Sequence, residues 1–207
     1  MTSQQSYINH NAEYEQESAF EREKTAHKKD EKFLYQSDIP HGDILDKYSF
    51  NTAVDIGCGT GWLANHLVED RKYKKVYAIE PSQAAIDIAK QLYPERKEVK
   101  YIVGFADKEL PKLKLKTPTF FSTMCVLAHL TDNEVLDILE ALNAIAPKES
   151  FLSFSEPWGN TYHRDCWHVR TPEWWSDNLP DWEFEFYNDY ELSDPPVRYK
   201  GFTAIKS

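Results

Sequence analysis

Val54-Asp55-Ile56-Gly57-Cys58-Gly59-Thr60-Gly61 is the stretch of sequence that decides the fold. Residues 52–56 favour a strand and residues 62–69 favour a helix, so the three glycines form the turn between them. Glycine lets the backbone turn tightly and lets a ligand approach without meeting a Cβ. Such a turn lies at the carboxyl end of a strand, which is where open α/β sheets bind ligands.

Outward from this turn, strand and helix patterns alternate along the chain, which predicts a doubly wound, mostly parallel α/β sheet with helices on both faces. Ser82 is placed to cap a helix over residues 83–93. A second helix is expected from a capping Asp132 to Pro147, because apolar residues recur there at spacings of three and four. The further parallel strands are expected at residues 75–80, 99–103, 120–124 and 151–154.

The end of the chain has a different pattern. Residues 182–190 and 198–205 both favour strands, and no helix fits between them, so they are predicted to form an antiparallel pair. The expected sheet therefore has seven strands with an antiparallel C-terminal strand. Residues 51–207 form the main domain, and residues 1–50 form an N-terminal helical extension.

The charge and composition exclude several classes of protein. The formal net charge is −10, and the chain lacks the basic stripe that binds phosphate, so no nucleic-acid partner is expected. No apolar run approaches the roughly 20 residues of a membrane span, and no signal peptide is evident at the first residues. Three cysteines are too few, and odd in number, for a disulfide framework, which favours a reducing, cytoplasmic location.

Two carboxylates flank the glycine turn and indicate which nucleotide it binds. Glu80 ends the second strand, where a carboxylate can accept hydrogen bonds from both ribose hydroxyls. Asp55 lies just before the glycines, where it would repel a pyrophosphate but would attract an ammonium or sulfonium group. The spacing is G-x-G-x-G, whereas a dinucleotide prefers G-x-G-x-x-G. S-adenosylmethionine is thus favoured, and a nicotinamide-dependent oxidoreductase is an alternative.

Four segments in order resemble the motifs of class I S-adenosylmethionine-dependent methyltransferases: residues 54–61, 78–82, 104–107 and 124–130. The resemblance covers residues 51–158, with the third helix reduced to a loop near residues 110–117. It implies S-adenosylmethionine as cofactor, S-adenosylhomocysteine as product, and an adenine contact by the acid of the third motif. The expected cofactor-binding residues are Asp55, Gly57, Cys58, Gly59, Gly61, Glu80, Pro81, Ala106, Asp107, Met124 and Cys125.

Methyl transfer is an in-line displacement at a carbon that the sulfonium already activates, so the protein must chiefly align the acceptor and exclude water. A hydroxyl acceptor also needs a general base. His129, after the fourth strand, and Glu156, after the fifth, are the candidate catalytic residues. Each also has a structural interpretation, as a hydrogen-bonded residue at a helix start and as a loop carboxylate.

Aromatic, imidazole and guanidinium groups are dense in residues 162–175, which are expected to cover the acceptor or to form a packed cap. Arginine there would grip an anionic group. The N-terminal helix is expected to act as a lid, with Phe33 and Tyr35 among its contacts, or to be an ordinary packing helix. The expected substrate-binding residues are Tyr14, Trp158, His163, Arg164, His168 and Arg170.

The sequence therefore predicts methylation of an oxygen or nitrogen on a small molecule, such as a sugar or a natural-product intermediate, by a monomer or homodimer. A protein substrate and a non-catalytic cofactor-binding module are alternatives. No metal is expected, because the spacing of His163, Cys166 and His168 matches no standard zinc pattern.

Overall fold

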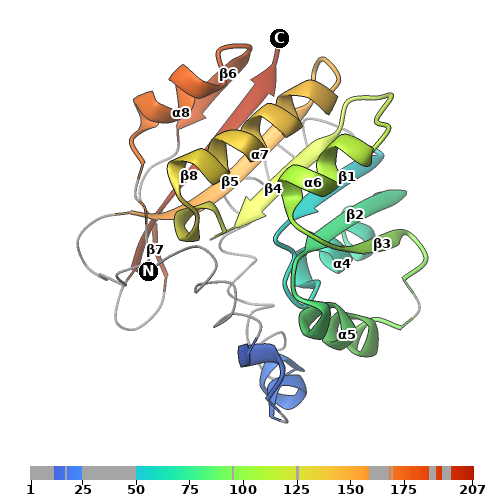
Figure 1. The fold of residues 1–207 in the computed structure, drawn as a ribbon. Helices are drawn as coiled ribbons and strands as arrows, with labels where there is room; N and C mark the ends of the chain where they lie inside the picture. The colour runs from blue at the N-terminus through green and yellow to red at the C-terminus, as the bar shows by residue number, and fades with distance from the viewer. Residues whose placement is uncertain are drawn as a thin grey trace.

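The computed structural model in Figure 1 describes residues 12–16, 18–24, 50–94, 96–124, 126–158, 168, 170–186, 190–192 and 197–207. For residues 155–158, 186, 190–192 and 197–201 only the backbone is described.

One mixed sheet forms the centre of the fold, with strand order β3-β2-β1-β4-β5-β8-β6 and with β7 paired to β8. Strands β1 to β5 are parallel to one another, and β8 is antiparallel to both β5 and β6. This confirms the predicted doubly wound α/β fold. The strands are β1 Thr52–Ile56, β2 Lys75–Glu80, β3 Val99–Val103, β4 Phe120–Met124, β5 Phe151–Trp158, β6 Trp182–Phe186, β7 Tyr190–Leu192 and β8 Val197–Lys206.

The tail of the sheet differs from the prediction in one respect. The expected strand at residues 182–190 is described as β6 at residues 182–186 and β7 at residues 190–192, so the described sheet has eight strands. Both pair with β8, which spans ten residues. Its second half pairs with β6 from residue 202 onward, and residues 197–199 pair with β7.

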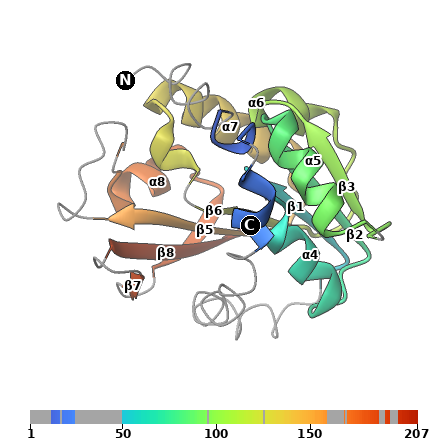
Figure 2. The same ribbon diagram turned by 90° about the horizontal axis from the view of Figure 1, so that it is seen from below.

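Helices cover both faces of the sheet (Figure 2). Apolar residues of α4 and α5 pack with those of β1, β2 and β3 on one face, and α7 and α8 pack on the other. Residues 12–14 and 19–24 are also helical. The elements are α4 Trp62–Glu69, α5 Gln83–Leu92, α6 Ala106–Glu109, η1 Leu110–Lys112, η2 Leu127–His129, α7 Asp132–Ile145 and α8 Pro172–Asn178.

The helix starts follow local side-chain chemistry. Ser82 caps α5 as predicted, since its Oγ accepts a hydrogen bond from the backbone N–H of Ala85 at 3.2 Å. The cap of α7 was predicted one residue too late. Thr131 is the N-cap and forms a capping box with Glu134, whose Oε2 accepts the backbone N–H of Thr131 at 2.9 Å. Asp132 is therefore the first helical residue.

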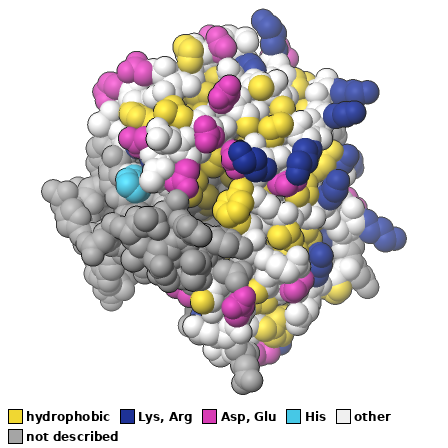
Figure 3. Space-filling model, in the orientation of Figure 1, with side chains coloured by type: hydrophobic (Ala, Val, Ile, Leu, Met, Phe, Trp, Pro, Cys, Tyr) yellow, Lys and Arg dark blue, Asp and Glu magenta, His cyan; other side chains and the backbone are white. Residues whose placement is uncertain are grey.

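Charge is unevenly distributed over the face in Figure 3. Lysine and arginine side chains gather on the side of the molecule that carries β3 and α6, while acidic side chains are spread more widely. No helix in the described part of the chain is long and apolar enough to cross a membrane.

Candidate active site

The glycine turn after β1 is held against the end of β2. The backbone N–H groups of Gly57 and Cys58 both donate to the carbonyl of Ile79, at 2.8 and 3.0 Å. Gly57 and Gly61 have φ angles of +70° and +79°, which residues with a Cβ rarely adopt.

Close packing also requires glycine in this turn. A Cβ on Gly57 would lie 2.3 Å from Cγ2 of Val126, and a Cβ on Gly61 would lie 2.5 Å from the hydroxyl of Tyr101. Asn65 of α4 donates from Nδ2 to that hydroxyl at 2.7 Å. The sequence analysis missed Val126, Tyr101 and Asn65, because nothing in their spacing signals contact with the glycines.

Glu80 is buried, with 2% of its surface exposed, at the point where β2 ends. Its Oε2 accepts the backbone N–H of Gly59 at 3.1 Å, and its Oε1 accepts that of Ser82 at 3.0 Å. These two bonds fix the orientation of the Glu80 carboxylate at the glycine turn.

Asp55 lies beneath the turn and is only 3% exposed. Its Oδ2 has no hydrogen-bond partner among the described residues. Burial, and then the charge of Glu80, raise the pKa of Asp55 to about 7, while a hydrogen bond from the backbone of Ala64 acts in the opposite direction. A buried carboxylate oxygen without a partner is costly unless a donor or a cation completes it. The ammonium group of S-adenosylmethionine fits this requirement.

The remaining predicted cofactor residues lie around these two acids. Cys58 is buried, and burial raises the pKa of its thiol, so it supplies backbone and volume but no thiolate. Pro81 and Met124 are half-buried at the ends of β2 and β4, whereas Cys125 lies outside the described residues. Ala106 begins α6.

Asp107 lies in the first turn of α6, half-buried, and pairs with Lys108 Nζ at 2.8 Å. Two apolar side chains beside it are unusually open, since Val103 is 42% exposed and Phe105 is 53% exposed. The sequence analysis did not select them. The sequence feature that could have identified them is a large apolar residue on each side of Gly104, at the point where β3 ends.

The N-terminal segment lies against the glycine turn. Oε2 of Glu23 accepts a hydrogen bond from the hydroxyl of Thr60 at 3.1 Å. The hydroxyl of Tyr14 lies 3.5 Å from the position that a Cβ on Gly59 would take. Burial, and then Glu23, raise the pKa of Tyr14 above its ordinary range. Phe33 and Tyr35, the other expected lid contacts, lie outside the described residues.

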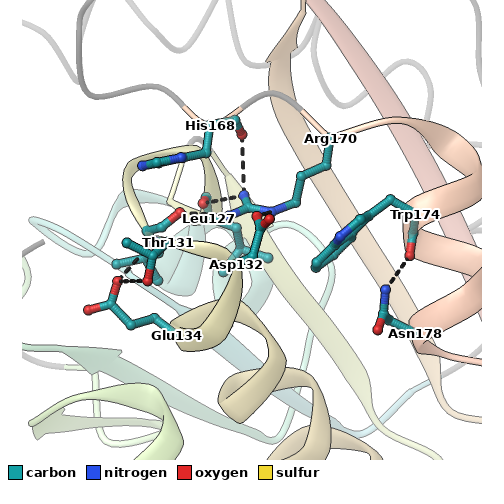
Figure 4. A network of polar contacts seen from close by, with 9 residues as sticks. Leu127, Thr131, Asp132, Glu134, His168, Arg170, Trp174 and Asn178 are labelled. Atoms are coloured by element: carbon teal, nitrogen blue, oxygen red, sulfur yellow. Dashed lines mark hydrogen bonds and ion pairs between the residues drawn. The ribbon is translucent and has the colours of Figure 1, made fainter.

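The segment after β4 carries His129, half-buried at the end of η2. Arg170 is buried against this segment, and its Nε donates to Oδ1 of Asp132 at 2.9 Å (Figure 4). Its guanidinium carbon lies 5.1 Å from the ring centre of Trp174. All three guanidinium nitrogens donate hydrogen bonds within the chain. Arg170 is thus a structural brace here, which differs from the substrate-gripping role that was predicted.

Several predicted acceptor residues are not placed by the structure. Glu156 and Trp158 are described only as backbone at the end of β5, and His163 and Arg164 lie outside the described residues. The imidazole of His168 is exposed. No cluster of three or more metal-ligating side chains is found where the chain is described.

Comparison with known proteins agrees with this geometry. Residues 53–147 match the profile of a family described as "Methyltransferase domain". This match to a methyltransferase domain agrees with the resemblance of the sequence motifs in residues 54–130. A comparison with curated proteins finds no significant sequence match.

Solved structures share the fold at low sequence identity. A S-adenosylmethionine-dependent methyltransferase from Archaeoglobus fulgidus is 14% identical, with a TM-score of 0.64 over 86% of this chain and 97% of that chain. DhpI, crystallised with S-adenosylhomocysteine, is 15% identical, with a TM-score of 0.60 over 99% of this chain and 97% of that chain. The methyltransferase domain of bacterial CtHen1 is 18% identical, with a TM-score of 0.60 over 80% of this chain and 94% of that chain.

Proposed function

We propose that this chain transfers the methyl group of S-adenosylmethionine to an oxygen or nitrogen atom of a small-molecule acceptor. The observation that carries the proposal is the pair of buried acids at the glycine turn. Asp55 offers a buried oxygen without a partner among the described residues, and the Glu80 carboxylate lies at the same turn, bonded to the N–H groups of Gly59 and Ser82. This pair matches a ligand with both an ammonium group and ribose hydroxyls.

We call the glycine turn at residues 57–61, together with Asp55 and Glu80, the cradle. Each part of the cofactor has a matching group in or beside it. The Asp55 carboxylate would bind the ammonium, and the Glu80 carboxylate would accept the ribose hydroxyls. The open apolar side chain of Phe105 offers a surface for a flat adenine ring, with Asp107 near enough in the chain to accept its amino group. The bound cofactor supplies a methyl group already activated by a positive sulfur.

The acceptor side is assigned to the segments after β4 and β5. For a hydroxyl acceptor, its oxygen forms the new bond to the methyl carbon while the bond from carbon to sulfur breaks, leaving a neutral thioether. His129 would take the hydroxyl proton as general base, since an imidazole titrates in the useful range. Glu156 is the second candidate for this role.

Residues 1–50 would act as a lid that closes over the bound cofactor. The proximity of Tyr14 to Gly59 and the hydrogen bond from Thr60 to Glu23 support this proposal, because both contacts are made at the glycine turn. A closed lid would exclude water from the reaction. Trp158, His163, Arg164 and His168 are the proposed lining of the acceptor pocket.

The net charge of −10 favours a small molecule over a nucleic acid as acceptor. A screen of cell metabolites with methyl-labelled S-adenosylmethionine tests the proposal, and label should appear in a small-molecule product. Thermal unfolding with S-adenosylhomocysteine or NADH separates the rivals, because only the true cofactor raises the melting temperature. Label found only in protein would overturn the small-molecule acceptor, and stabilisation by NADH alone would overturn methyl transfer.

A further inference from the structure

Arg170 holds the backbone of residues 127–130, the segment that includes His129, from outside that segment. Figure 4 shows its guanidinium group beside Leu127, Asp132 and His168. One terminal nitrogen of the guanidinium, Nη1, donates to the carbonyl of Leu127 at 2.8 Å. The other, Nη2, donates to the carbonyl of Leu130 at 2.6 Å. These two carbonyls lie on either side of His129 in the chain, so one buried cation fixes both ends of the turn that carries the imidazole.

A second contact strengthens the same connection. The backbone N–H of His168 donates to the carbonyl of Ala128 at 2.7 Å. The carbonyl of His168 in turn accepts from Nη1 of Arg170 at 3.2 Å. The connection that leads from β5 to α8 is therefore joined to the segment after β4 by backbone as well as side-chain bonds. Both segments are ones to which the acceptor was assigned.

The chemistry of the contact requires arginine. Its planar fork presents several N–H donors in fixed directions, whereas a lysine ammonium is a point charge on a flexible stem. The Arg170 side chain is only 3% exposed, so its hydrogen bonds are shielded from water, and Asp132 provides the opposite charge. Lysine would keep the charge but would not hold the carbonyls of Leu127 and Leu130 in one geometry.

We infer that Arg170 is a positioning residue for methyl transfer, which sets the orientation of His129 towards the acceptor without touching the acceptor itself. This inference rests on the proposed function. A misplacement of a catalytic group by about 1 Å can cost about 100-fold in rate, so loss of the fork should weaken catalysis with little effect on the cofactor site, which lies on β1 and β2.

The test compares Arg170→Lys and Arg170→Ala with the wild-type chain. In chains saturated with S-adenosylhomocysteine, hydrogen–deuterium exchange of the variants should become faster at the amides of His129 and Leu130, which bond within the turn. The Kd for S-adenosylhomocysteine should stay within about twofold, while kcat/KM for the acceptor found in the labelled-methyl screen should fall about 10- to 100-fold. Millimolar guanidinium should restore part of the turnover of Arg170→Ala but not of Arg170→Lys.

Asn143→Ala is the matched control, because Asn143 Oδ1 accepts the indole N–H of Trp182 at 3.0 Å near the far end of the same helix, α7. It should lower the melting temperature without changing the acceptor kinetics. Wild-type exchange in Arg170→Lys overturns the inference, and so does faster exchange with unchanged kcat/KM. A wild-type chain that methylates nothing in the screen overturns the proposed function instead, and with it the catalytic role of Arg170.

Discussion

The backbone N–H of Gly59 donates a hydrogen bond to Oε2 of Glu80 at 3.1 Å, so the glycine turn and the end of β2 are tied together by one carboxylate. The same carboxylate accepts the N–H of Ser82, where α5 begins. Glu80 thus connects the turn after β1 to the start of α5.

Replacing Glu80 by alanine should weaken cofactor binding. The variant loses hydrogen bonds between the ribose and a charged group, which are worth roughly 1.5–3 kcal/mol, or about 10- to 150-fold in Kd. Calorimetric titration with S-adenosylhomocysteine measures the effect. Glu98→Ala, at an exposed position before β3, is the control and should bind like the wild type. Equal affinity in both variants would remove Glu80 from the site.

The raised pKa of Asp55 predicts a pH-dependent stability of the ligand-free chain. Because the pKa is about 7 instead of 3.8, the folded chain keeps a proton in this interval that the unfolded chain releases. Relative to Asp55→Asn, the free energy of unfolding of the wild type should therefore fall by up to about 4 kcal/mol as the pH rises from 4 to 7. It should fall no further above pH 7. Urea unfolding across this range measures the difference.

Saturating S-adenosylhomocysteine should flatten this pH dependence, because its ammonium group favours the ionised carboxylate of Asp55. Asp177→Asn, at an exposed position in α8, serves as control and should follow the wild type at every pH. A wild-type curve parallel to that of Asp55→Asn would show that Asp55 is ordinarily ionised.

Gly57→Ala should destabilise the chain by about 1–3 kcal/mol, because the left-handed φ is costly for alanine and the new methyl group meets Val126. Adding Val126→Ala should recover the steric part of the loss but not the backbone part. Thermal unfolding of the single and double variants gives the coupling between the two sites. Purely additive losses would contradict the packing described here.

The hydrogen bond from Thr60 to Glu23 allows a test of the proposed lid. Thr60→Val removes the hydroxyl that donates to Glu23, which should destabilise the closed arrangement by about 1 kcal/mol. Release of S-adenosylhomocysteine, followed by stopped-flow fluorescence, should become about fivefold faster at that cost. Glu21→Ala, exposed on the same N-terminal helix, is the comparison variant. An unchanged release rate in Thr60→Val would mean that the N-terminal segment packs without closing the site.

His129→Ala should slow methyl transfer by about 100-fold or more if the imidazole is the general base, with cofactor affinity preserved. The pH profile of kcat/KM for a hydroxyl acceptor should lose its acidic limb in the variant. Transfer at the wild-type rate would assign His129 to structure and leave Glu156 as the candidate base.

The sequence was sufficient for the sheet, because strand and helix periodicity follow directly from which face is buried. It was also sufficient for the cradle, since the glycines and Glu80 have a fixed spacing within one strand-turn-helix unit. It failed at Thr131, although the pattern from Thr131 to Glu134 is a capping-box signature that competes with the choice of Asp132. Two neighbouring residues could both cap, and the capping box with Glu134 is formed by Thr131.

The role of Arg170 was out of reach for a different reason. Arginine is seldom buried, so a surface contact with an anionic acceptor was the natural expectation. Its burial depends on carbonyls about 40 residues earlier, which no local pattern reveals. Tyr14 was predicted as a contact of the N-terminal segment, and its hydroxyl lies near Gly59, 45 residues later in the chain.

A crystal structure of the chain with S-adenosylhomocysteine tests the central claim most directly. The account predicts the ammonium nitrogen of the ligand within hydrogen-bond distance of Asp55 Oδ2, and both ribose hydroxyls on Glu80. Density for the nucleoside away from the glycine turn, or an Asp55 oxygen still without a partner in the complex, would contradict it.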